Sequence, residues 1–503
     1  MQYDVVFVIG ELFFDHPLSG VGLLKRLLEK YGYSVGVIEQ PTSAKDVTKL
    51  GAPKLFFGVS SGAIDSMVRN YTPLKKRRDE DEFAEYDEKV MDRALIVYCN
   101  WLKEHFKGVP LVLGGTEATL RRFAHYDYWQ NKLRKPILVD TRADIMVYGN
   151  GEKPILEIAQ RIKEGKDLFD IKGTCILTKE LPDAATVLPS YEEVVASKEA
   201  FVDLQNGLTN IKTLAQKVDT RYVIQYVSPK YTSQDLDEYY ELPFTRKVPK
   251  TLRGFEFSVV THRGCLGECS FCALPLIQGD KIVSRSEESI IREITAMTTL
   301  PHFKGNVDDL GGPSANMYGM DCGKCTRACL QGCSVLDRSN KRLISLLRKL
   351  RAIKGVKHIY IRSGIRYDLA SEEYVKELVA GGHIYDTLRI APEHVNKNVL
   401  QLMQKDEGNL QNFINFFESL NTNKELSYYF ITAHPGSTMK EAKELHQAMK
   451  GLKNAHDVQV FIPTPMTDST CMYYTGMDLK KNKIHVPYTY KEKKEQKRVL
   501  YEA

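Results

Sequence analysis

Three cysteines in one short stretch carry the clearest chemistry in this sequence. Cys265, Cys269 and Cys272 follow the spacing C-x-x-x-C-x-x-C, and Phe271 precedes the last of them. Thiolates are the usual ligands of iron in iron–sulfur clusters, and three of them can hold three corners of a cubane. The fourth iron then keeps an open coordination site. The alternatives are a structural zinc site, which would need a fourth ligand such as His262, or free thiols.

A second group of four cysteines follows within twelve residues. Its members are Cys322, Cys325, Cys329 and Cys333. Four thiolates can fully ligate zinc or a second iron–sulfur cluster, and the spacing does not decide between them. A loop without metal, either redox-inert or closed by disulfides, is the other interpretation. We expect a metal here, and we expect the last three cysteines to be buried and inert: Cys99, Cys175 and Cys471.

The composition excludes several classes of protein. The chain has 503 residues, of which 43% are hydrophobic and 27% charged, so global disorder is excluded. The net charge of +6 is too small over this length to indicate nucleic-acid binding. We find no apolar run of about 18 residues and no secretion signal, and we expect a cytoplasmic protein without membrane contact.

Two regions alternate strand and helix patterns and must position these groups. Residues 1–170 predict a doubly wound parallel sheet of the α/β class, covered by helices on both faces. Residues 171–250 have prolines, aromatics and little periodicity, which favours a linker that wraps the next domain. Residues 251–478 predict six strands with intervening helices, typical of a partial or full β/α barrel with a cysteine-rich insertion at 313–338. Residues 479–503 form a basic tail, either a solvated end or a terminal helix.

The first cysteine group resembles the cluster loop of the radical SAM superfamily. In that superfamily a C-x-x-x-C-x-aromatic-C loop follows the first strand of a β/α barrel. The resemblance implies a four-iron–four-sulfur cluster whose open iron chelates S-adenosylmethionine. One electron from the cluster then cleaves the sulfonium, which yields methionine and a 5′-deoxyadenosyl radical. The partners it implies are S-adenosylmethionine, a reductant such as flavodoxin or ferredoxin, and a substrate.

Three later segments are similar to S-adenosylmethionine-binding segments of that superfamily. Gly311, Gly312 and Pro313 end the second strand and resemble a Gly-Gly-Glu-Pro segment, although the glutamate is absent. Glu393 ends the fourth strand, where related enzymes contact the ribose. His434 lies in a turn after the fifth strand that looks like Gly-x-Pro-Gly-x-Thr. The resemblance assigns these five residues to cofactor binding and assigns no catalytic residue.

Longer segments resemble one family, the YgiQ-type radical SAM proteins, over nearly the whole chain. They include Phe14–Pro17, Gly114–Arg122, His125–Trp129, Tyr240–Arg246, Asp309–Tyr318 and Phe461–Pro465. The substrate of this family is unassigned, so the resemblance implies the chemistry and leaves the product open.

The N-terminal region looks like a cobalamin-binding domain of the type that precedes some radical SAM barrels. Those domains carry Asp-x-His-x-x-Gly, and here His16 follows Asp15 directly, one place early. A cobalamin-dependent methyltransferase and a domain with the fold but without the cofactor both stay open. Cys99 alone in this region argues against a tRNA methylthiotransferase. An alternative from another class is a metal-dependent nucleic-acid-binding regulator that uses the second cysteine group and the basic tail.

Overall fold

The computed structural model describes residues 2–78, 90–322, 330, 333–405, 408–455 and 457–501. Contacts divide the chain into two compact units. The first comprises Met1–Lys230, Leu242–Thr251 and Ile462–Lys483, and the second comprises Tyr231–Glu241, Leu252–Phe461 and Ile484–Ala503. The chain therefore passes between the two units several times.

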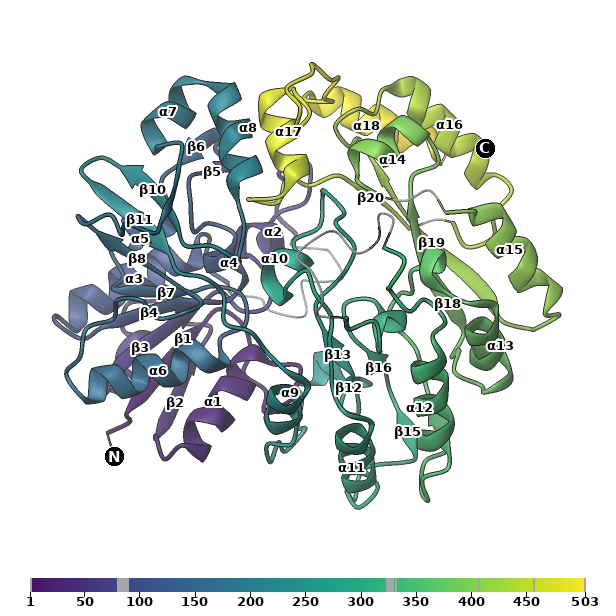
Figure 1. The fold of residues 1–503 in the computed structure, drawn as a ribbon, viewed down its shortest axis with the longest axis horizontal. Helices are drawn as coiled ribbons and strands as arrows, with labels where there is room; N and C mark the ends of the chain where they lie inside the picture. Colours follow the sequence, from purple (N-terminus) through teal and green to yellow (C-terminus); the bar gives the residue numbers. More distant parts are fainter. Residues whose placement is uncertain are drawn as a thin grey trace. The chain divides into compact units, whose positions relative to one another are not determined.

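The first unit contains a large sheet, whose described residues form nine strands in the order β2-β1-β3-β4-β7-β8-β11-β10-β9. Its first five strands are parallel: β2 (Val35–Glu39), β1 (Val5–Ile9), β3 (Phe56–Ser60), β4 (Leu111–Gly114) and β7 (Ile145–Val147). The order reverses at β1, so right-handed crossovers place helices on both faces. Helix α1 (Gly20–Lys30) lies beside α6 (Glu152–Lys163), and α3 (Ala94–His105) packs on β3 from the other face (Figure 1). The doubly wound sheet is confirmed.

The expected linker at 171–250 is wrong for residues 174–225, which extend this sheet. They form β8 (Thr174–Thr178), β9 (Thr186–Leu188), β10 (Leu214–Val218) and β11 (Arg221–Gln225). The apolar pattern is weak because polar residues occupy buried positions of these strands. Gln216 accepts a hydrogen bond from the backbone N–H of Ala124 at 2.7 Å, and Gln225 accepts one from Arg122 at 2.7 Å. Partners about a hundred residues away satisfy these amides, and no local pattern reveals them.

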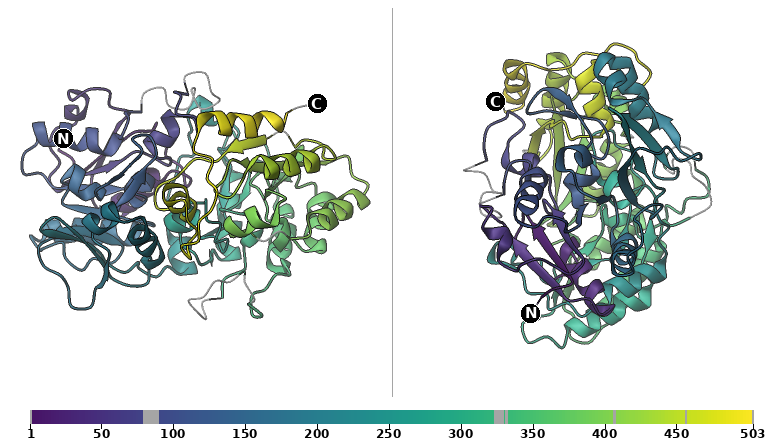
Figure 2. Two further views of the ribbon diagram at one scale, coloured as in Figure 1. Left: turned by 90° about the horizontal axis from the view of Figure 1, so that it is seen from above. Right: turned by 90° about the vertical axis from the view of Figure 1, so that its left-hand side faces the viewer.

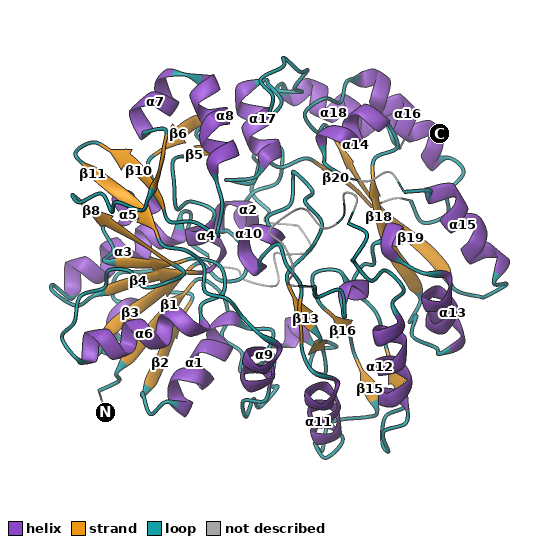
Figure 3. Ribbon diagram, viewed as in Figure 1, coloured by secondary structure: helices purple, strands orange, loops and turns teal. Residues whose placement is uncertain are grey.

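The second unit contains the barrel, whose strands are among those drawn in orange in Figure 3. A separate antiparallel pair in this unit joins β13 (His262–Arg263) to β14 (Val283–Ser284). The described barrel strands form six segments, two short strands sharing the second of them, and the segments pair in sequence order and in parallel. The strands are β12 (Val259–Val260), β15 and β16 (Asn306–Val307 and Leu310–Gly311), β17 (His358–Ile359), β18 (Thr387–Glu393), β19 (Glu425–Thr432) and β20 (Asp457–Val460). A bridge between Ile365 and Ile390 joins the third segment to the fourth. The partial β/α barrel is confirmed.

Helices follow the strands of this unit as expected. They are α11 (Glu287–Met297), α12 (Lys341–Arg351), α13 (Glu372–Ala380), α14 (Lys397–Leu402), α15 (Leu410–Ser419) and α16 (Met439–Met449). Apart from α14, whose Val399 and Leu400 belong to a small separate cluster, their apolar faces build one core with the strands, through residues such as Ile294, Leu347 and Leu378. The catalytic edge of such a fold is formed by the loops after the strands.

The C-terminal end of the barrel lies earlier than expected. Residues 462–478, expected in the barrel, belong to the first unit by their contacts together with residues 479–483, and α17 (Asp468–Thr475) packs there on α8 (Lys198–Gly207). The final helix α18 (Tyr490–Val499), yellow in Figure 2, packs on α16 in the second unit. Gln496 of this helix is buried and accepts hydrogen bonds from the Ala433 N–H and the Ser437 hydroxyl. Within the described residues, no helix combines the length and apolar character that crossing a membrane requires.

Candidate metal centre

The loop that carries the first cysteine group, residues 264–273, is fixed at both ends. We call it the cluster loop. It follows β13 (His262–Arg263) and leads into α10 (Leu274–Gln278). The N–H of Cys265 donates to the Gly279 carbonyl at 3.0 Å, and the Ser270 N–H donates to the Met403 carbonyl at 2.8 Å. The Ser270 hydroxyl adds a bond to the Leu402 carbonyl at 2.8 Å. The loop is therefore anchored to the end of α14 as well as to its own flanks.

All three cysteines of the cluster loop are free thiols that share one region. Cys265 is buried, and Cys269 and Cys272 are half-buried. Burial raises the pKa of Cys265, and the neighbouring Cys269 raises it further. Burial also raises the pKa of Cys272 to about 12, and the other two thiols contribute. A metal that binds Cys265 and Cys272 must therefore displace the protons of their thiols.

The donor set fits an iron–sulfur cubane. Among the described residues, no group of three or more His, Cys, Asp or Glu side chains is placed to hold one metal ion. In a cubane each thiolate binds a different iron, so three sulfurs need not converge on a single point. Three free thiols on one anchored loop are the donors that such a cluster requires.

Two cations act on these thiols, and the sequence analysis did not identify either of them. Arg366 donates from Nη1 to the Cys269 sulfur at 3.5 Å. Arg366 and Lys405 both act to lower the pKa of Cys265. Arg366 follows the third strand, so its place at a strand end was the signal available in the sequence.

The Gly311-Gly312-Pro313 segment has a packing role in addition to its predicted role in cofactor binding. Gly311 pairs with Val260 at the end of the first two strands. A Cβ on Gly312 would lie 2.6 Å from the ring of the buried His262, so the imidazole occupies the space that a side chain would need. Burial lowers the pKa of His262 to about 4, so this ring is neutral. Binding of S-adenosylmethionine by this segment stays a prediction.

The ends of β18 and β19 lie beside the cluster loop. Glu393 is a buried carboxyl whose backbone has φ +67°, at an irregularity in the pairing of the two strands. Burial raises the pKa of Glu393 to about 7, and Lys405 lies 3.9 Å away. The ring centroid of His434 is 6.4 Å from that of Phe271, which lies between Cys269 and Cys272. Two of the predicted cofactor-binding residues therefore belong to the surroundings of the cysteines.

Two buried polar atoms in this region have no partner among the described residues. They are Nε2 of His394 and the hydroxyl oxygen of Thr432. The His394 Nδ1 accepts the Asn396 N–H at 3.0 Å, which places the proton on Nε2. Burial lowers the pKa of His394 to about 4, so the ring is neutral. A buried N–H donor without an acceptor fits a site for a polar ligand such as S-adenosylmethionine.

The second cysteine group is described only in part. Cys322 and Cys333 are half-buried free thiols. Cys325 and Cys329 lie outside the described residues. Metal binding by this group stays a prediction.

In the first unit, His16 does not fit as a metal ligand. It lies after β1, at the switch point where ligands bind to sheets of this order. The side chain is fully buried, its Nδ1 accepts the Leu18 N–H at 3.0 Å, and its Nε2 faces Nη1 of Arg246 at 3.4 Å. Both ring nitrogens are thus engaged within the protein, and we derive no step through cobalamin.

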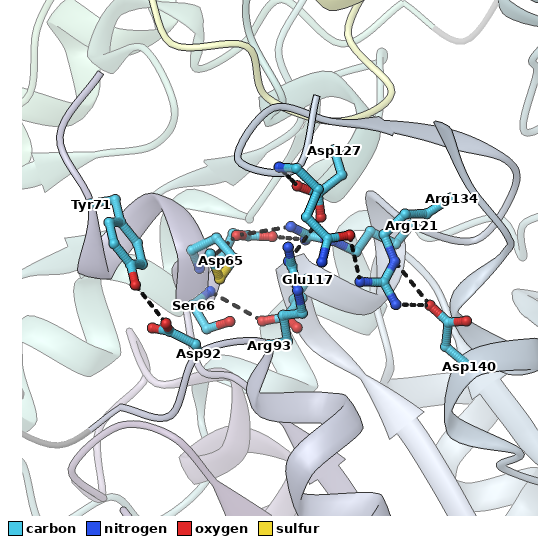
Figure 4. Close-up of polar contacts among 12 residues, drawn as sticks. Asp65, Ser66, Tyr71, Asp92, Arg93, Glu117, Arg121, Asp127, Arg134 and Asp140 are labelled. Carbon is cyan, nitrogen blue, oxygen red and sulfur yellow. Dashed lines mark hydrogen bonds and ion pairs between the residues drawn. The ribbon is translucent and has the colours of Figure 1, made fainter. Parts of the chain in front are cut away.

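A buried ionic network fills the carboxyl ends of β3 and β4 in the same unit (Figure 4). Asp65 caps α2 (Ser66–Asn70) and forms a buried ion pair with Arg121. Glu117, from α4 (Gly115–Thr119), accepts the Ser66 N–H at 3.1 Å. Further pairs surround this centre: Arg93 with Asp127, Tyr71 with Asp92, and Arg134 with Asp140. Because these charges are paired, the network explains the Gly114–Arg122 segment as a structural support of the strand ends.

Profiles of two families match consecutive parts of the chain. The Radical SAM N-terminal family matches residues 1–258, and the Radical SAM superfamily matches residues 259–449. A UPF0313 protein of Methanocaldococcus jannaschii is 42% identical over 538 aligned positions, which cover 99% of this chain and 89% of that protein. A UPF0313 protein of Fusobacterium nucleatum is 41% identical and covers 99% of this chain and 96% of its own length.

Two solved structures share the fold. The radical S-adenosylmethionine methyltransferase TsrM from Kitasatospora setae, with cobalamin and a [4Fe-4S] cluster bound, has a TM-score of 0.55 at 16% identity. The alignment covers 94% of this chain and 79% of TsrM. The cobalamin-dependent radical enzyme OxsB has a TM-score of 0.51 at 13% identity, with 89% of this chain and 52% of OxsB covered. At these identities the likeness concerns the fold alone.

Proposed function

Because this chain belongs to the UPF0313 family of radical SAM proteins, we propose that Cys265, Cys269 and Cys272 hold its four-iron–four-sulfur cluster. The superfamily implies that cluster and S-adenosylmethionine as cofactors. When both are bound, the cluster supplies the electron that divides S-adenosylmethionine into methionine and a 5′-deoxyadenosyl radical. The radical then acts on a substrate that is unassigned.

The residues around the cluster loop would hold S-adenosylmethionine against the open iron. The backbone of Gly311, Gly312 and Pro313 would bind its amino group. Glu393 and His434, at the ends of β18 and β19, would contact the remainder of the cofactor. The unpaired His394 Nε2–H would donate a hydrogen bond to one of its polar atoms. The apolar rings of Phe271 and Phe461 beside His434 would limit the access of water.

One observation carries this proposal more than any other. Three free thiols lie on a loop that is anchored at the end of the first barrel strand. Cys269 contributes to the raised pKa of Cys265, and both of these thiols contribute to the raised pKa of Cys272, so the three share one region. A bound metal cluster would replace the thiol protons and stabilise the three cysteines in this shared region.

The proposal is tested by iron binding and spectroscopy on anaerobically reconstituted protein. We expect about four irons and four sulfides at the first cysteine group, and an electron paramagnetic resonance signal of the reduced cluster that changes when S-adenosylmethionine is added. Cys269→Ser should lose this signal, because one of three protein ligands is removed. Zinc alone at the first group in the wild-type protein would contradict the proposal.

A matched control separates loss of a ligand from loss of a thiol. Cys99 is fully buried in α3 of the first unit, where burial raises its thiol pKa. Cys99→Ala should retain the iron and the response to S-adenosylmethionine. The same loss of signal in both variants would show that the spectroscopic change follows from general destabilisation.

The location and the electron donor belong to the same proposal. An oxygen-labile cluster needs a reducing environment, which supports a cytoplasmic protein. The electron would come from a low-potential one-electron carrier of the flavodoxin or ferredoxin class. The proposal does not include cobalamin. The fold resembles those of TsrM and OxsB, but both ring nitrogens of His16 are engaged within the protein.

A further inference from the structure

Arg366 is a buried cation that points at the cluster loop. Its side chain is 6% exposed, and Nη1 donates to the sulfur of Cys269 at 3.5 Å. A Cβ on Gly267 would lie 2.5 Å from the same Nη1, so glycine at this position leaves room for the guanidinium. Both sides therefore contribute to the contact: Arg366 supplies the donor, and Gly267 of the cluster loop leaves the space for it.

A rigid frame holds the guanidinium in this orientation. Asp368 accepts hydrogen bonds from Nε and from Nη2 of Arg366, the latter at 2.7 Å. The backbone of Arg366 is held by Asn316, whose amide accepts the Arg366 N–H at 2.9 Å and donates to the Arg366 carbonyl at 2.8 Å. With Nε and Nη2 occupied by the carboxylate, Nη1 is the nitrogen left to face the sulfur.

We propose that Arg366 raises the reduction potential of the cluster at the first cysteine group by donating a hydrogen bond to the Cys269 sulfur. This inference rests on the proposed function. It makes Arg366 a positioning and tuning residue, with Asp368, Asn316 and Gly267 as the parts that fix its direction.

The physical basis is the charge that reduction adds. A cluster held here would gain one electron from a low-potential one-electron carrier, and its sulfur ligands would become more negative. A charge-assisted N–H donor stabilises the reduced state more than the oxidised state. Arginine does not release its proton in this range, so no proton moves with the electron. Because the contact is buried, salt screens it only weakly.

The test is a redox titration of reconstituted protein, followed by electron paramagnetic resonance. Arg366→Gln removes the charge and the fork geometry. We expect about a tenfold fall in the ratio of reduced to oxidised cluster at the wild-type midpoint, which for a one-electron couple is about 59 mV toward lower potential. Arg366→Lys keeps the charge without the fork and should give a smaller shift. Iron, sulfide and thermal unfolding are measured on each variant.

The matched control is Arg348→Gln, the same exchange on α12 of the same unit, where the arginine pairs with Glu377 at 2.7 Å. It should leave the midpoint unchanged. An unchanged midpoint in Arg366→Gln with full iron overturns the inference and leaves the proposed function intact. Loss of iron in both Arg366 variants also overturns it, because the residue would then hold the loop instead of tuning the cluster. Wild-type protein without a cluster would instead refute the proposed function.

Discussion

Gly264, directly before Cys265, offers a sharp test of how the cluster loop is built. Its φ is +86°, and a Cβ there would lie 2.7 Å from the backbone carbonyl carbon of Lys281 and closer still to the carbonyl oxygen. In Gly264→Ala the Lys281 carbonyl oxygen must retreat by well over an ångström to reach the ordinary contact distance of 3.4 Å. That movement strains the hydrogen bond from Cys265 to Gly279.

The destabilisation expected for Gly264→Ala has two parts. A left-handed conformation costs an alanine about 1–2 kcal/mol. Crowding of packed backbone adds about 1–3 kcal/mol. Sites of this kind tolerate displacements of only about 0.5 Å. We therefore expect Gly264→Ala to lose most of its iron while the remainder of the protein stays folded.

Gly254 provides the matched control, because it has the same φ of +86° and only the end of the Arg362 side chain within 4 Å. Gly254→Ala carries only the free-energy cost of the left-handed backbone conformation and should keep its iron. The assay is the iron and sulfide content of reconstituted protein, together with circular dichroism and thermal unfolding. Full iron content in Gly264→Ala would refute the reasoning, and equal losses in both variants would show that backbone conformation alone is responsible.

Three further predictions concern buried charges. Arg121→Met leaves the Asp65 carboxylate buried and unpaired, so the free energy of unfolding should fall by about 3–5 kcal/mol in thermal unfolding. The control is Arg134→Met at a more exposed ion pair, where the free energy of unfolding should fall by less than about 1 kcal/mol. Equal losses in the two variants would contradict this account of the network. Burial raises the pKa of Glu393 to about 7, so its stabilisation of the folded apoprotein is complete below about pH 4.5 and is lost as the pH rises through 7. Glu393→Gln should therefore melt higher than the wild-type apoprotein at pH 8 and equally at pH 4.5, and an equal melting temperature at pH 8 would argue against this. Electron paramagnetic resonance of protein incubated with cob(II)alamin should show no coupling to a His16 nitrogen, and coupling that disappears in His16→Ala would refute our placement of that ring.

The barrel strands could be predicted because each combines a local apolar pattern with a helix after it. The intervening helices that the pattern predicts are present, among them Glu287–Met297, Glu372–Ala380 and Leu410–Ser419. The segment at 174–225 could not be predicted, because Gln216 and Gln225 occupy buried strand positions and take their partners from distant residues. Local periodicity does not contain that information.

The candidate site could likewise be predicted from the sequence only in part. The cysteines are recognisable because their spacing lies within eight residues. The contact between Arg366 and Cys269 joins residues 97 positions apart, and only the folded barrel brings them together. The resemblance assigns Gly312 to cofactor binding, and only the structure shows that the buried His262 ring also occupies the space of its missing side chain. Sequence spacing thus finds the candidate metal ligands, and the fold is needed to find the residues that surround them.

The most direct test of the central claim is the formation of 5′-deoxyadenosine and methionine from S-adenosylmethionine. Anaerobically reconstituted protein is supplied with a low-potential reductant, and both products are quantified by mass spectrometry. We predict that the wild-type protein forms both in equal amounts, and that Cys269→Ala forms neither. Wild-type protein with a complete cluster that forms no 5′-deoxyadenosine, even with candidate substrates, would contradict the claim.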